Sequence, residues 1–320
     1  MTTVGTGTTL PLTSTRLERW LWWTAIANLV ANIGIIVTGG VVRLTGSGLG
    51  CPTWPRCTEE SYVAHGALGW HGAIEFGNRL LTFVVAAVAI ACWVLALLVR
   101  RARRARGASP DSRPLVLTTL VALGVPLQAV IGGITVLTDL NPYVVALHLL
   151  ASMAMVALCV LLLDVLRGPV RESAASRLRT LGPVLLVEGW VVLWLGTVVT
   201  GSGPHAGDLD AHRTGLDPEL VSRLHAWAVW LLVALTVAAL VLARREGRAP
   251  AVRAAMVLLV VELAQGVIGY VQYFTGLPEV LVGLHLLGAG LTSAALAWAF
   301  VSTRPLPARD GPFPGLVSLP

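Results

Sequence analysis

The sequence contains no lysine and few charged residues of any kind. Charged residues make up 12% of the 320 positions, and all 23 basic side chains are arginine. Hydrophobic residues make up 55%, and the mean hydropathy is +0.76. This composition lies outside the range of soluble domains and indicates a polytopic membrane protein. The net charge of +6 does not indicate a nucleic-acid partner, because the arginines gather in short segments between apolar runs.

Cysteine is also scarce, with four residues in the chain. Cys92 and Cys159 lie inside apolar runs, and we interpret them as packing residues. Cys51 and Cys57 are six positions apart in a polar segment, with two prolines between them. That spacing allows a disulfide if the segment faces an oxidising compartment. A zinc site is disfavoured, because the spacing is not of the CxxC type and there is no second pair.

Eight apolar runs are each long enough to cross about 30 Å of hydrocarbon, which takes about 20 residues in a helix. They predict an all-α membrane protein with spans at 20–42, 71–99, 115–137, 144–166, 181–200, 222–243, 252–275 and 280–301. The first run follows Arg16 and Arg19, and no small-residue cleavage site follows it. We therefore interpret it as a retained helix and not as a signal peptide.

The segments between the runs alternate in charge. Arginine gathers before the first run and in every second connection, and this set includes RRARRAR at 100–106, Arg171 and Arg309. The remaining segments are richer in Asp, Glu, Gly and Pro, and comprise 43–70, 138–143, 201–221 and 276–279. The positive-inside rule therefore predicts that both termini are cytoplasmic. The segment with Cys51 and Cys57 then lies outside, where a disulfide persists.

The chain repeats itself at an offset of 137 residues. QAVIGGITVLTDLNPYVVALHLL (128–150) matches QGVIGYVQYFTGLPEVLVGLHLL (265–287), and VVRLTGSG (41–48) is echoed by GTVVTGSG (196–203). We predict two four-helix halves related by a parallel repeat, since both begin on the cytoplasmic side. The predicted divisions are a tail at 1–19, an N-terminal half at 20–166, a linker at 167–180, a C-terminal half at 181–301 and a tail at 302–320.

Three histidines lie inside apolar runs at matched depth, namely His148, His225 and His285. Ionisable groups within a span are costly and usually face the interior of the helix bundle. A single histidine of this kind would be interpreted as forming a hydrogen bond between helices. Three histidines lie at one depth here, and two of them are equivalent in the repeat. This pattern indicates ligands of a haem iron in four-helix bundles. The other histidines of the loops are interpreted as solvated: His65, His205 and His212.

The second apolar run begins with a polar stripe. His71, Glu75 and Asn78 share one helix face, and Arg79 follows. At about 1.5 Å per residue, Asn78 lies about 10 Å deeper than His71 and level with His148. Either His148 alone holds a haem iron in the first half, or His71 reaches down to supply a second ligand. Depth favours His148 alone.

Together these segments resemble the haem A synthase family, which converts haem O to haem A for terminal oxidases. The resemblance covers residues 20–302 and rests on GGVVRLTGSGLGCPTWPRC, IEFGNR, TGSGPHAGD, RLHAW and the two repeat segments. The motif of the family in the second span is Glu-x-x-His-Arg. Glu75 and Arg79 carry over, whereas Asn78 stands at the position of the histidine.

The resemblance implies a multi-pass oxidoreductase of the bacterial inner membrane. It would oxidise a methyl group of haem O to a formyl group by successive hydroxylations. It implies haem b between His225 and His285, and haem O as substrate, becoming haem A as product, in the first half. The implied partners are the enzyme that donates haem O and the assembly of the terminal oxidase. The electron donor and a homo-oligomer are left open.

Glu75 is the residue expected nearest the chemistry, as proton donor or acceptor, with a purely structural ion pair as the alternative. Three arginines near the outer ends of spans are expected either to pair with haem propionates or to extend to the membrane interface: Arg43, Arg79 and Arg223. Glu188 and Glu262 also lie inside spans, and we assign them no role.

Two other functions share parts of the pattern. A di-haem membrane cytochrome that takes electrons from quinol would use the same histidines but needs neither Glu75 nor haem O. A transporter is suggested by the repeat, but it is expected to have broken helices near the midplane of the membrane. In this sequence the polar residues gather near the outer ends of the spans instead.

Overall fold

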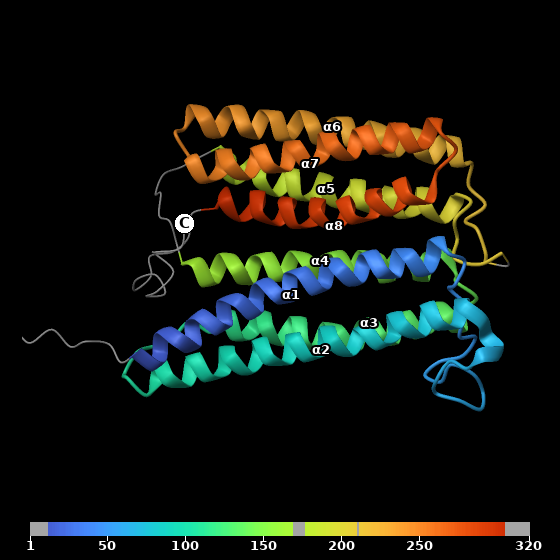
Figure 1. Cartoon of the computed structure of the whole chain (residues 1–320). Coiled ribbons are helices and arrows are strands. Elements are labelled where there is room, and N and C mark those ends of the chain that lie inside the picture. Colours follow the sequence, from blue (N-terminus) through green and yellow to red (C-terminus); the bar gives the residue numbers. More distant parts are fainter. Residues whose placement is uncertain (1–11, 169–176, 210, 305–320) are drawn as a thin grey trace, which may run out of the picture.

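The computed structural model describes residues 12–168, 177–209 and 211–304. The predicted cytoplasmic residues Arg171 and Arg309 lie outside these ranges, as do residues 1–11. All regular structure in the described part is helical, as predicted (Figure 1). The helices are α1 (Leu12–Leu44), η1 (Gly66–Leu68), α2 (Gly69–Arg104), α3 (Arg113–Leu137), α4 (Pro142–Arg167), α5 (Leu178–Ser202), α6 (Pro218–Arg245), α7 (Ala249–Phe274) and α8 (Glu279–Ser302).

Eight of these helices are long and apolar enough to cross a membrane, which confirms the number of predicted spans. Most begin or end a few residues beyond the predicted run, and polar side chains cap the start of two of them. Asn141 accepts a hydrogen bond from the N–H of Tyr143 ahead of α4, and Asp217 does the same for Glu219 ahead of α6. A proline stands at the first helical position in both cases, where no N–H is needed. Each of the eight helices runs unbroken between its bounds.

The helices pack as two rings of four. In the first ring α1 contacts α2, α2 contacts α3, α3 contacts α4 and α4 closes back onto α1. Helices α5, α6, α7 and α8 contact one another in the same order. We call these rings the first and second bundles. In each of them the second and fourth helices stand diagonally across the interior, so α2 faces α4 and α6 faces α8.

Helices α1 and α4 of the first bundle pack against α5 and α8 of the second. A glycine allows the closest approach, since a Cβ built on Gly40 would lie 2.3 Å from Cδ2 of Leu286. The hydroxyl of Ser293 in α8 donates a hydrogen bond to the carbonyl of Met153 in α4 at 2.8 Å. One cluster of buried apolar side chains continues through both bundles, so they share a core.

The connections alternate between the two ends of the molecule (Figure 1). One end carries the start of α1 and the α2–α3 and α6–α7 connections, and there Arg103 pairs with Glu18 at 2.8 Å. We call it the arginine end. The opposite end, the loop end, carries the segments 45–68, 138–141, 203–217 and 275–278. Residues 12 and 304 both lie at the arginine end, as an even number of antiparallel helices requires. The membrane side that each end faces stays a prediction.

Candidate haem-binding bundles

Each histidine within a span packs against a glycine of a neighbouring helix. A Cβ built on Gly132 of α3 would lie 3.3 Å from Cε1 of His148, and one built on Gly269 of α7 would lie 3.5 Å from Cε1 of His285. A Cβ built on Gly196 of α5 would lie 3.4 Å from Cε1 of His225. The two repeat-equivalent histidines therefore use repeat-equivalent glycines. The absence of a side chain at these positions lets each imidazole approach the neighbouring helix closely.

The three imidazoles share a second feature. The Nδ1 atom of His148, of His225 and of His285 is buried and has no hydrogen-bond partner among the described residues. Buried polar atoms in native proteins nearly always have a partner. A histidine that served only to join helices would use its ring nitrogens for hydrogen bonds. His225 also bonds to the backbone of Val192 in α5, but in all three rings the unpartnered nitrogen is compatible with service as a ligand of a haem iron.

The two histidines of the second bundle lie on diagonal helices. His225 belongs to α6 and His285 to α8, and the rings are close enough to interact electrostatically. Imidazoles on facing helices of a four-helix bundle are suited to bind one iron from both sides. The residues present in the second bundle therefore fit a haem with two histidine ligands.

In the first bundle, His148 lies on α4, and the diagonal helix α2 carries its histidine, His71, in its first turn. Asn78 lies two turns further along α2, and its Oδ1 accepts a hydrogen bond from the hydroxyl of Thr38 at 2.7 Å. His71 stays at the loop end, where its Nδ1 lies 3.1 Å from the hydroxyl of Ser47. Its ring also packs on Trp70, with 3.7 Å between ring centroids. The residues of this bundle fit a haem with one histidine ligand.

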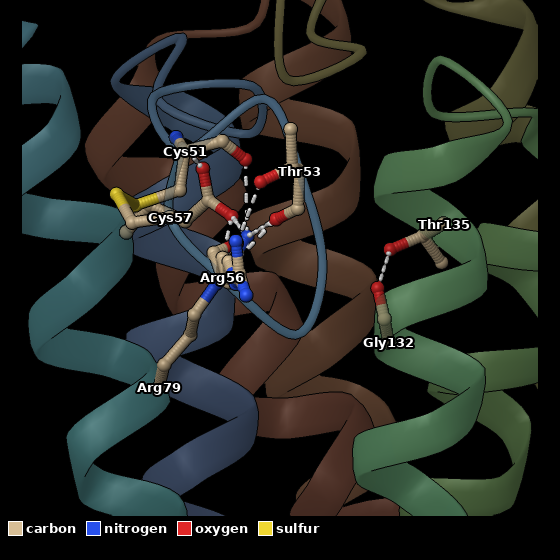
Figure 2. A network of polar contacts seen from close by, with 8 residues as sticks. Cys51, Thr53, Arg56, Cys57, Arg79, Gly132 and Thr135 are labelled. Atoms are coloured by element: carbon tan, nitrogen blue, oxygen red, sulfur yellow. Dashed lines mark hydrogen bonds and ion pairs between the residues drawn. A yellow bond between two sulfur atoms is a disulfide. The ribbon is translucent and has the colours of Figure 1, made fainter. Parts of the chain in front are cut away.

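Glu75 forms an ion pair with Arg79 and binds the loop that carries Cys51 and Cys57. One carboxylate oxygen of Glu75 accepts from Arg79 at 2.5 Å, and the other accepts from the N–H of Cys51 at 2.6 Å. Arg79 also donates to the carbonyls of Cys51, Thr53 and Arg56, so that it points into the loop (Figure 2). Glu75 is only 6% exposed. The pair therefore anchors the loop to α2, in agreement with the structural alternative for Glu75.

The loop itself is closed by the predicted disulfide between Cys51 and Cys57 (Figure 2). Its Trp54 reaches helix α3, because a Cβ built on Gly133 would lie 2.3 Å from Cδ2 of that ring. Gly133 is the neighbour of Gly132, which contacts His148. The disulfide loop therefore covers the first bundle at the depth of its candidate ligand.

The three arginines expected either to pair with haem propionates or to extend to the membrane interface differ in their surroundings. Arg79 is occupied by Glu75 and the loop carbonyls. Arg223 pairs with Glu219 one turn earlier on α6, and both side chains are exposed. Arg43 instead crosses to the second bundle, where it donates to the carbonyls of Thr200 and His205. Arg43 alone is partly buried and without a carboxylate partner among the described residues.

The prediction that His205 is a solvated loop residue is wrong. The side chain is partly buried, and Nε2 lies 2.9 Å from the carbonyl of Leu277 in the α7–α8 turn. The segment after α5 folds back over the end of the second bundle, which brings the two segments together. His65 and His212 are exposed, as predicted.

The family follows from comparison with known proteins. A model of the cytochrome oxidase assembly protein family matches residues 18–73 and 70–207, which is more than half of the chain. The chain belongs to this family. Three relatives, each named haem A synthase, show how far the similarity extends. The relative from Sphingopyxis alaskensis is 29% identical over 88% of this chain and 91% of its own length.

The other two relatives of the family match over shorter stretches. The one from Shewanella oneidensis is 28% identical over 57% of this chain, and the one from Geobacillus thermodenitrificans is 28% identical over 51%. The matches span about half of these two relatives, 56% and 49% of their lengths.

Several residues around the sites of this family member escaped sequence analysis. Thr38 donates a hydrogen bond to Asn78, Trp54 packs on Gly133 of α3, and Arg213 lies near Arg43. None shows a local pattern, because each acts on a residue far away in the chain. The glycines at 132 and 269 did carry a signal, since they recur at the repeat offset.

Glu262 is the other buried acid of the second bundle. Its Oε1 accepts a hydrogen bond from the hydroxyl of Thr236 at 2.7 Å, and its Oε2 has no partner among the described residues. It lies in the middle of α7, seven residues from Gly269 and toward the arginine end. No group of three His, Cys, Asp or Glu side chains that suits a metal ion occurs in residues 12–168, 177–209 and 211–304.

Proposed function

We propose that the protein is a haem A synthase, which oxidises one methyl group of haem O to a formyl group. The observation that carries the proposal is the pair of imidazoles on the diagonal helices α6 and α8, in a chain of this family. The names of the relatives support the same reaction, and one of them matches over 91% of its length. The product, haem A, would be delivered to terminal oxidase assembly.

The two bundles would do different work. His225 and His285 would hold haem b, which would supply electron transfer. His148 alone would hold haem O. A single histidine ligand suits both a substrate that is exchanged and a reaction with oxygen. The bond between Thr38 and Asn78 supports this division, because it occupies the side chain that replaces the histidine of the family.

The reaction adds oxygen to a methyl carbon twice, and loss of water then leaves the formyl group. Bound haem supplies the chemistry that activates oxygen, and an external donor of unidentified nature supplies electrons. The residues of the chain would position the substrate and control its surroundings. Trp54 and the disulfide loop would exclude water from the first bundle. Glu75 would donate or accept a proton at the edge of the substrate, held in place by Arg79 and Cys51.

The arginine end would face the cytoplasm of a bacterial cell. The loop end, with the disulfide, would then face the oxidising side of the inner membrane. Haem O would arrive from the enzyme that makes it within the same membrane.

Production of haem A in a host that makes haem O and lacks its own synthase tests the proposal. Extracted haems are separated by chromatography, and a haem A peak is expected only with the intact chain. His225→Ala and His285→Ala should each remove haem b from the purified protein and abolish haem A formation. A host that accumulates haem O alone, while the purified protein carries two haems, would instead favour a di-haem cytochrome.

A further inference from the structure

A pocket lies between the two bundles at the loop end. Apolar side chains of the α3–α4 turn and of α4 line one side, among them Leu140, Val145 and Leu149. Thr197 and Thr200 of α5 line the other side. The remaining polar lining comes from Arg43 of α1 and His212 of the loop after α5. The pocket thus combines an apolar wall with basic groups from both bundles.

The basic groups at this pocket are held by neutral acceptors. Arg43 donates to the carbonyls of Thr200, at 2.7 Å, and of His205. Arg213 donates to the carbonyls of Pro204 and Ala211, both at 2.8 Å. Backbone carbonyls fix the direction of a guanidinium group but do not neutralise its charge.

Among the described residues, neither Arg43 nor Arg213 forms an ion pair with a carboxylate. The two arginines lie close enough for their charges to repel each other. A partly buried guanidinium beside a second cation is unfavourable unless an anion completes the site. The first turn of α4 adds to the positive potential of the pocket. Its helix N-terminus carries a partial positive charge, it lines the pocket with Pro142, and it contains no acidic residue.

The position of the pocket points to the occupant. Thr200 lies one helical turn beyond Gly196, the residue on which His225 packs, and that turn rises about 6 Å toward the loop end. A haem held between His225 and His285 would have its polar edge on this side, since carboxylates avoid the hydrocarbon interior. The carboxylate edge of such a haem would therefore lie against the cationic pocket.

We propose that this pocket binds a propionate carboxylate of the haem held by the second bundle, with Arg43 of the first bundle as its ion-pair partner. The inference rests on the proposed haem site of His225 and His285, and not on the reaction in the first bundle. Arg43 would then be a positioning residue that ties α1 to the cofactor of the other half. Arg213 and His212 would stand at the rim and keep the local charge positive.

The test compares ordinary haem with haem whose propionates are methyl esters, each titrated into the haem-free full-length protein in detergent. The wild type should bind ordinary haem more tightly than the ester, and Arg43→Gln should lose this preference. We expect Arg43→Gln to weaken binding of ordinary haem on the order of tenfold, as for loss of a charged hydrogen bond, and to leave ester binding unchanged. Arg56→Gln is the matched control, because Arg56 is an exposed arginine of the same end.

A second readout is the midpoint potential of the second-bundle haem. Removal of a nearby cation favours the ferric form, so the potential should fall in Arg43→Gln and not in Arg56→Gln. Each tenfold change in the ratio of ferric to ferrous affinity corresponds to about 59 mV. Arg43→Lys, which keeps the charge, should restore most of the potential.

Three results would overturn the proposal. Equal weakening of ordinary and esterified haem by Arg43→Gln would mean that Arg43 only joins the two bundles. Phosphorus that co-purifies with the wild type and is lost in Arg43→Gln, with no preference for ordinary haem, would identify a phospholipid headgroup as the occupant. Failure of the second bundle to bind haem would remove the ligand itself. A protein that binds haem with these preferences but makes no haem A would leave the pocket intact and reject only the proposed reaction.

Discussion

At the scale of single residues, Asn78 would decide which kind of iron site the first bundle offers in the proposed function. It lies on α2, the helix diagonal to the one that carries His148, and accepts a hydrogen bond from Thr38 of α1. An amide is a poor iron ligand, and His71 lies against Ser47 at the loop end. The proposal therefore gives the second bundle two histidine ligands and the first bundle one.

Asn78→His should convert the first bundle into a second two-histidine site. The added imidazole faces His148 across the bundle interior, so a haem bound there becomes six-coordinate. We expect the high-spin contribution to the absorption and electron paramagnetic resonance spectra to disappear and a second low-spin signal to appear. Leu81→His, on a neighbouring exposed position of α2, is the control and should not change the spectra. Unchanged spectra in Asn78→His would mean that no haem lies between α2 and α4.

Glu262 and Thr236 form a buried hydrogen-bonded pair, and we expect its loss to lower the stability of the protein. Thr236 is fully buried and Glu262 is 3% exposed, so removing the acceptor leaves the threonine hydroxyl without a partner. We expect Glu262→Ala to lower the free energy of unfolding by about 1–3 kcal/mol. Glu262→Gln keeps an acceptor oxygen and should cost less. Helix melting followed by circular dichroism in detergent measures both, and a Glu262→Ala variant as stable as the wild type would contradict the role of the pair.

At the scale of elements, glycines set how the helices and the external loop meet. Gly132 and Gly133 are adjacent on α3, yet one contacts His148 and the other contacts Trp54. The external loop and the candidate ligand therefore share one turn of helix. Because the same loop also binds Glu75 and Arg79 on α2, it spans the mouth of the first bundle.

Gly133→Ala should loosen this cover without touching the disulfide itself. The new Cβ would lie 2.3 Å from Trp54, so the ring must move away from α3. With an overpacking cost of about 1–3 kcal/mol, the rate at which a thiol reagent reduces Cys51–Cys57 should rise by about tenfold. Gly77→Ala is the matched control, because nothing lies within 4 Å of a Cβ at that position of α2. Equal reduction rates in both variants would show that Trp54 does not hold the loop.

The sequence was sufficient to predict the helices but not the contacts between segments that are distant in the chain. Length and hydropathy predicted α2 to α8 closely, since each span is a local property of about 20 residues. The three span histidines could also be predicted, because their depth and repeat offset are visible in the chain. The partners of Arg43 and His205 could not, because backbone carbonyls act as acceptors and carry no sequence signal.

At the scale of the whole molecule, two four-helix bundles share a buried core but carry different candidate functional residues. Helices α1, α4, α5 and α8 form the common wall, and Arg43 and Gly48 cross it at the loop end. The first bundle carries the disulfide loop and His148, whereas the second carries the pair His225 and His285. In the proposed function, electrons would therefore pass through that wall, from the second bundle to the first.

The orientation of the whole molecule in the membrane is the last prediction. Arginine is concentrated at one end, so that end should face the cytoplasm. A cysteine at Val63, which is 55% exposed at the loop end, should react with a membrane-impermeant maleimide in intact spheroplasts. A cysteine at Ala108, exposed in the α2–α3 connection, should react only after the membrane is opened. The native thiols Cys92 and Cys159 are buried and provide the unlabelled background. The opposite labelling pattern would place the disulfide loop in the reducing cytoplasm, where Cys51 and Cys57 would not stay oxidised.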